Sequence, residues 1–126
     1  MKLVTEAILK ALRKTPYGSQ DGSRRGARVI ARYFVAHCTW YVLEDESYEK
    51  TGTVYGLANL GHGWEYGPFS IPEIGRVSVP VRVRNMKGEV LSIGLAEVER
   101  DRFVRPLKMT LGECERTYGE NFDEIA

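Results

Sequence analysis

Hydrophobic side chains recur at helical spacing near the start of the chain, and helix-opening patterns return further along. Over residues 5–14, alanine, isoleucine and leucine come back every three or four positions, which predicts a helix capped by Thr5. Ser70 and Thr110 each precede a glutamate by three positions, the spacing of a capping box. We therefore expect a short central helix after Ser70 and a C-terminal helix over residues 110–118.

The segments between these helices have the composition of strands. Residues 28–37, 39–43 and 53–59 are rich in β-branched and aromatic side chains, which predicts an antiparallel meander. The acidic run at 44–46 interrupts the apolar pattern, so we expect it in a turn after the second strand. The glycine-punctuated segment 61–67 follows the third strand and is expected as a loop.

The clearest strand pattern lies at residues 77–84, where valines alternate with polar residues. We expect the valine face to meet the core and the other face to meet solvent. Pro80 cannot donate to a ladder, which places it on an edge strand or at a bulge. A turn at 86–88 then leads to a partner strand over 89–95.

This order of elements predicts an α+β fold. We expect a mainly antiparallel sheet with an N-terminal helix, a short central helix and a C-terminal helix, the helices packed on one side. The length of 126 residues suits one core, so we expect a single domain over 1–126. Within it, residues 17–27 are expected to form a mobile loop and residues 120–126 a frayed tail.

Composition excludes several classes of protein. Eighteen basic residues nearly cancel seventeen acidic ones, which excludes a histone-like chain and an acidic mimic. No apolar run approaches the length of a membrane-spanning helix, and the first six residues lack the apolar core of a signal peptide. We therefore expect a cytoplasmic protein without a membrane partner, with Cys38 and Cys114 as thiols.

An aromatic segment provides the first candidate site. Trp64 and Tyr66 are two positions apart, so they share a face if the chain is extended there. Tryptophan and tyrosine often dominate protein interfaces, which favours a partner-binding site that includes His62 and the hairpin residues Arg82 and Arg84. The alternative interpretation is that Trp64 closes one end of the core.

Arginines provide the second candidate site. If the strands that carry them are neighbours, they form a basic sheet face that binds phosphates or an acidic protein. The members of this set are Arg24, Arg25, Arg28, Arg32, Arg82 and Arg84. The alternative is a solvated face balanced by the acidic residues at 44–49. No helix-turn-helix, zinc-finger or RNP pattern is present, which disfavours sequence-specific DNA recognition.

Two carboxylates provide the third candidate. Glu99 and Asp101 alternate along a predicted extended segment, which would place them side by side for acid–base chemistry, with His62 as a further group. The arginines around them favour an ion-pair network instead. The cysteines and histidines are too few and too scattered for zinc, so we expect no metal, no cofactor and no catalytic residue.

Several motifs together resemble a family of small single-domain proteins of unknown function carried by plasmids, integrative elements and phages. The resemblance covers roughly residues 3–115 and is most specific at Glu-Arg-Asp-x-Phe-x-x-Pro, residues 99–106. A Thr-Trp-Tyr strand at 39–41 and Phe-Ser-x-x-Glu at 69–73 also contribute. The hairpin over 77–95 departs from the family, which has a brief link there. The resemblance implies a bacterial cytosol, a mobile element and a conflict with host defence.

Together these observations favour a non-enzymatic protein-binding module, monomeric or homodimeric. We expect it to be an accessory protein of a mobile element and an inhibitor of a host defence component. Two alternatives stay open. One is a nucleic-acid-binding accessory protein that uses the arginine-rich sheet face. The other is a small enzyme centred on Glu99 and Asp101.

Overall fold

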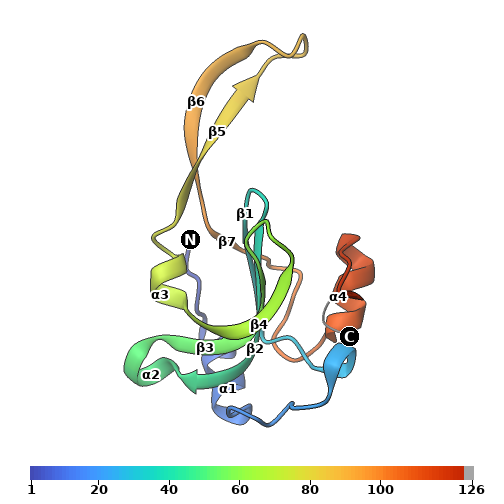
Figure 1. The fold of residues 1–126 in the computed structure, drawn as a ribbon. Coiled ribbons are helices and arrows are strands. Elements are labelled where there is room, and N and C mark those ends of the chain that lie inside the picture. The colour runs from blue at the N-terminus through green and yellow to red at the C-terminus, as the bar shows by residue number, and fades with distance from the viewer. Residues whose placement is uncertain (124–126) are drawn as a thin grey trace.

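A five-stranded antiparallel sheet forms the body of the protein (Figure 1). The computed structural model describes residues 1–123. The strand order is β4-β3-β2-β1-β7, and neighbouring strands run antiparallel. The strands are β1 (Ala31–Val35), β2 (Cys38–Ser47), β3 (Thr53–Asn59), β4 (Trp64–Ser70) and β7 (Glu99–Arg100). The predicted meander and the α+β class are therefore confirmed.

The three predicted helices are present and begin at the predicted caps. The Thr5 hydroxyl accepts a hydrogen bond from the Ile8 amide, the Ser70 hydroxyl accepts one from the Glu73 amide, and Thr110 forms a full capping box with Glu113. These helices are α1 (Glu6–Lys14), α3 (Ile71–Ile74) and α4 (Leu111–Tyr118). Two short helices, η1 (Arg24–Gly26) and α2 (Tyr48–Thr51), lie in segments without a predicted helix.

The helices cover both faces of the sheet, so the prediction that they pack on one side was wrong. Ile8 and Leu12 of α1 pack in one core cluster with Val42, whereas Leu111 of α4 belongs to a second cluster with Tyr41. Successive side chains of a strand point to opposite faces, so Val42 packs in the core on the α1 side and Tyr41 in the core on the α4 side. A strand buried on both faces shows a continuous apolar run, and residues 40–43 are such a run.

Two segments predicted as turn or loop are strands. The acidic run 44–46 continues β2, and Glu44 is buried because its carboxylate accepts hydrogen bonds from the amides of Gly18 at 2.9 Å and Gln20 at 2.7 Å. The second half of the glycine-rich segment is the start of β4. The Glu44 contacts also anchor the loop over residues 17–27, whose expected mobility stays a prediction.

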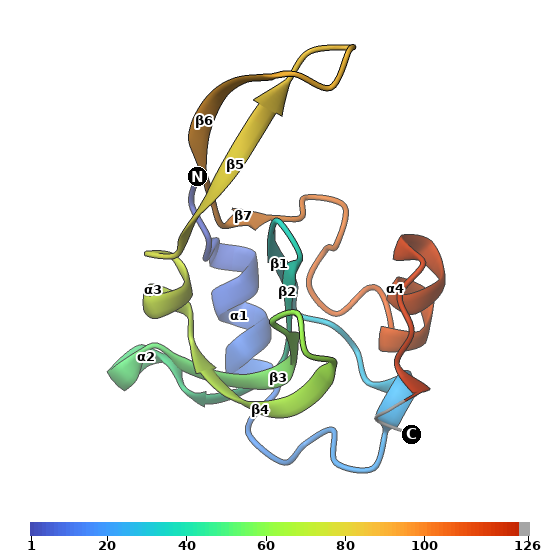
Figure 2. The same cartoon turned by 45° about the horizontal axis from the view of Figure 1, so that its top comes forward.

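The predicted hairpin forms a separate two-stranded sheet that projects away from the body (Figures 1 and 2). It consists of β5 (Ser78–Arg84) and β6 (Val90–Glu97). Pro80 is on an edge, as predicted, because each strand of this ribbon has only one neighbour among the described residues. The expectation that the valine face meets the core was wrong for the outer half, because Val83 is exposed.

The C-terminal segment is packed rather than frayed as far as the structure describes it. Phe122 has 0% of its surface exposed and belongs to the α4-side core. Residues 124–126 of the predicted tail lie outside the described residues. Among residues 1–123, none of the helices has both the length and the apolar content that a membrane crossing requires.

Candidate functional site

The outer face of the hairpin combines exposed apolar side chains with arginines. In the ladder, Pro80 lies opposite Leu95 and Arg82 lies opposite Ile93, so these side chains share one face. Ile93 and Leu95 leave 71% and 70% of their surfaces exposed, and Arg82 and Arg84 are exposed beside them. We call Pro80, Arg82, Arg84, Ile93 and Leu95 the recognition face.

The foot of the hairpin is fixed to the body. Val77, Val79 and Ala96 pack against the core cluster on the α1 side of the sheet. An isolated two-stranded hairpin is marginally stable in water, so this contact supplies packing that the ribbon alone lacks. Near the tip, Arg84 donates a hydrogen bond of 2.8 Å from Nη1 to the Gly88 carbonyl. The recognition face thus projects from the body on a hairpin whose base is packed against the core (Figure 1).

The aromatic residues predicted for partner binding do not form one surface. Trp64 is 9% exposed, and its ring centroid lies 4.7 Å from that of Phe122 and 5.7 Å from that of Tyr41. Trp64 is therefore a core residue, as the alternative interpretation has it. His62 lies in the turn before β4, whereas Arg82 and Arg84 belong to the hairpin.

Tyr66 is partly exposed and lines a cavity of about 240 Å³ together with Tyr55, Arg24 and Glu44. Burial raises the pKa of Tyr66, although Arg25 and Arg24 oppose that shift. The Tyr66 hydroxyl therefore stays protonated at neutral pH. The other residues that line this cavity come from the loop over residues 17–27, from β2 and from β3, and not from the hairpin.

The predicted arginine-rich sheet face is not formed. Arg28 and Arg32 are carried by the body, whereas Arg82 and Arg84 lie on a separate sheet. Arg28 donates from Nη1 to the Lys108 carbonyl at 3.3 Å. The strands that carry these arginines are not neighbours, so the nucleic-acid interpretation loses the surface on which it depended.

Arg32 lies at the centre of a buried polar cluster. It is 9% exposed and forms ion pairs with Asp101 at 3.2 Å and Glu120 at 3.3 Å. Its Nε donates to the Tyr41 hydroxyl at 3.0 Å, and that hydroxyl donates to Glu120. The guanidinium carbon is 3.9 Å from the centroid of the Tyr118 ring. This cluster ties β1 to the Glu-Arg-Asp motif and to the C-terminal segment.

The same cluster contains the ion pair that the second interpretation of the carboxylates expects. Asp101 is buried in its ion pair, whereas Glu99 is exposed. Both carboxylates line one open cavity, but His62 lines a different one, so His62 is not brought to the carboxylates. Burial raises the pKa of the nearby Cys114 to about 11, so this thiol is protonated at neutral pH.

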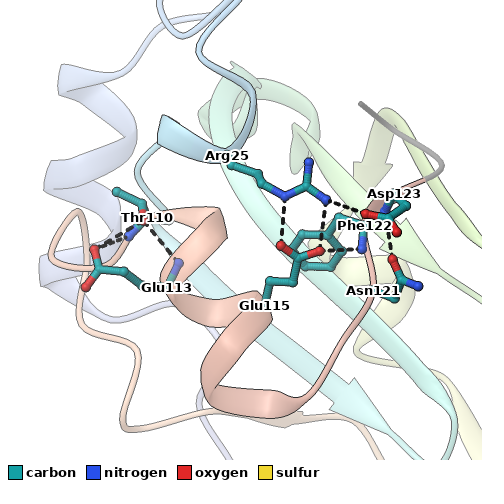
Figure 3. Close-up of polar contacts among 7 residues, drawn as sticks. All are labelled: Arg25, Thr110, Glu113, Glu115, Asn121, Phe122 and Asp123. Atoms are coloured by element: carbon teal, nitrogen blue, oxygen red, sulfur yellow. Dashed lines mark hydrogen bonds and ion pairs between the residues drawn. The ribbon is translucent and has the colours of Figure 1, made fainter.

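The C-terminal segment is held by a second polar cluster (Figure 3). The Glu115 carboxylate accepts from Arg25 Nε at 2.7 Å, from Arg25 Nη2 at 3.0 Å and from the Phe122 amide at 2.6 Å. Arg25 Nη2 also pairs with Asp123 at 3.2 Å. These contacts fix the backbone at Phe122 and seat its ring against Trp64.

The Glu115 cluster predicts a dependence of stability on acid. Hydrogen bonds from Arg25 and from the Phe122 amide lower the pKa of Glu115 below its ordinary value of 4.5. The unfolded chain therefore binds this proton more readily, and the associated stability is lost as the pH falls below 4.5. We expect Glu115→Gln to flatten this part of the pH profile in urea unfolding followed by tryptophan fluorescence. An unchanged profile would contradict the assignment, and Glu99→Gln is the exposed control.

The residues that sequence reasoning missed are Ile93 and Leu95. From the sequence we predict only a partner strand over residues 89–95, although leucine and isoleucine alternate at 91, 93 and 95. That alternation was the available signal for an apolar face on β6. Comparisons with known protein families, with curated proteins and with solved structures find no match to this chain.

Proposed function

We propose that the chain is a non-enzymatic protein-binding module whose contact surface is the recognition face of the β5–β6 hairpin. The observation that carries the proposal is the exposure of Ile93 and Leu95 on a ribbon that projects from the body (Figure 2). Large exposed apolar patches on soluble proteins often mark interaction sites. Water is released from these side chains when a partner covers them, which favours binding.

The chemistry of the face indicates the kind of partner. Arg82 and Arg84 stand in β5, next to the apolar side chains of β6. A protein surface with an apolar depression bordered by carboxylates complements this arrangement in both hydrophobicity and charge. The resemblance to proteins of mobile elements supports a partner in host defence, with the chain acting stoichiometrically as its inhibitor in the bacterial cytoplasm.

Substitution of the apolar residues tests the proposal. We expect the double variant Ile93→Asp/Leu95→Asp to bind the partner roughly a thousandfold more weakly, because buried apolar anchors contribute about 2 kcal/mol or more each. Both side chains are exposed in the free chain, so its free energy of unfolding should change by less than about 0.5 kcal/mol. The measurement is capture of interacting proteins by the immobilised chain, followed by titration of the purified partner.

The control places the same charges on exposed apolar residues of the body. Leu60 and Phe103 are exposed and lie outside the hairpin, so Leu60→Asp/Phe103→Asp should retain the partner. Loss of binding in this control together with retention in the hairpin variant would refute the proposed surface. Binding that weakens steeply with salt and extends to DNA would instead favour the nucleic-acid alternative.

A further inference from the structure

The hairpin has two outer edges that no strand covers within residues 1–123, and they are not equivalent. Proline has no N–H, so in a ladder it lies where its nitrogen faces the open edge. Pro80 therefore interrupts the row of donors on the outer edge of β5. That edge is blocked against the addition of another strand.

The pairing of Pro80 also fixes which groups β6 presents. Residues directly opposite in an antiparallel ladder either exchange two hydrogen bonds or point both sets of backbone groups outward. Pro80 lies opposite Leu95, so this is an outward-pointing pair. Ile93 is two residues from Leu95, so its backbone N–H and C=O groups also point toward the outer edge of β6. The outer edge of β6 thus presents unpaired donors and acceptors without an intervening proline.

The side chains of β6 are compatible with pairing to an identical strand. Residues 90–96 contain no charge, and Ile93 is the midpoint of this stretch. In an antiparallel register centred on Ile93, the uncharged stretch pairs with itself, and the two Ile93 side chains face each other. Leu91 of each copy comes opposite Leu95 of the other, although the register shift of the hairpin places Leu91 at a bulge. Glu89 of each copy comes opposite Glu97 of the other, so like charges meet only at the two ends of the pairing.

We propose that the chain forms a two-fold symmetric dimer in which β6 pairs antiparallel with β6 of a second copy. The result is a four-stranded sheet with the order β5-β6-β6-β5. Its central strands carry Ile93 and Leu95 from both copies, and its outer strands carry Arg82 and Arg84. The inference rests on the proposed function and deepens it, because it doubles the recognition face.

Cysteine cross-linking tests both the dimer and its register. Hydrogen-bonded antiparallel pairs have Cα atoms about 5.5 Å apart, which suits a disulfide. In a Cys38→Ser background, Ile93→Cys should therefore yield a covalent dimer under mild oxidation. Arg82→Cys is the control: it lies opposite Ile93 in the same hairpin, but its copies are separated by three strand spacings, about 14 Å. Equal cross-linking of both variants would refute the register.

Sedimentation of the unmodified chain provides the second measurement. We expect the mass of two chains for the wild type and of one chain for Ile93→Pro, since proline removes the outward N–H at the centre of the pairing. The internal ladder does not use that N–H, so the circular dichroism spectrum should be unchanged. A wild type that sediments as one chain at tens of micromolar would overturn the dimer. Partner capture by that monomer would leave the proposed function standing.

Discussion

Replacing Gly56 with alanine is expected to destabilise the protein by roughly 3 kcal/mol or more, enough to threaten folding. Gly56 lies in β3 opposite Val42 of β2. A Cβ atom at this position would lie 1.8 Å from the Tyr41 carbonyl oxygen. The carbonyl belongs to the backbone in the centre of the sheet, and the backbone of residue 56 fixes where Cβ lies, so neither a rotamer change nor a small shift removes the clash. The measurement is urea unfolding followed by tryptophan fluorescence.

Gly67→Ala is the matched control for this substitution. Gly67 lies directly opposite Gly56, on β4, and a Cβ atom there would have no neighbour within 4 Å. We expect its stability to stay within about 1 kcal/mol of the wild type, because the added methyl group restricts the unfolded chain without a clash. Equal unfolding midpoints for the two variants would contradict the packing of β3 against β2.

Removal of the Arg32 guanidinium is expected to have the second large effect. Arg32→Met should lower the free energy of unfolding by about 3–5 kcal/mol, because it leaves two carboxylates without their cation. Those carboxylates are the buried Asp101 and the partly buried Glu120. Methionine keeps much of the apolar volume of the side chain, so lost packing contributes little. Chemical denaturation at neutral pH measures the difference.

The partner groups provide a stringent control for this explanation. If the loss comes from unpaired charge, the triple variant Arg32→Met/Asp101→Asn/Glu120→Gln should regain a substantial part of the stability. A triple variant less stable than Arg32→Met would show that the carboxylates stabilise the fold independently of the arginine.

Local signals predicted the helices well. Thr5, Ser70 and Thr110 each satisfy an amide within three residues, so the information needed to start a helix lies in the adjacent sequence. Glu44 shows the opposite case. An acidic run is typical of a turn, and its burial in β2 depends on amides at Gly18 and Gln20, far away in sequence.

The candidate site was harder to predict for the same reason. Trp64 is buried partly by Phe122, and Phe122 is seated by the contact between Arg25 and Glu115, which are 90 positions apart. The residues next to Trp64 in the sequence therefore cannot predict that it is buried. In the hairpin, the alternation of valines with polar residues over 77–84 correctly predicted the strand. The same alternation led us to expect that the valine face packs against the core. The sequence pattern carries no sign that the ribbon projects beyond the body.

The central claim is that the projecting part of the hairpin captures a protein, and a trimmed chain tests it most directly. The measurement is the affinity for the captured partner when residues 80–95 are replaced by an Asn-Gly turn between Val79 and Ala96, which are opposite in the ladder. The foot residues Val77, Val79 and Ala96 stay in place, so the body should remain folded. We predict that the trimmed chain unfolds at nearly the same urea concentration as the full chain and no longer binds the partner. Undiminished affinity in the trimmed chain would contradict the account.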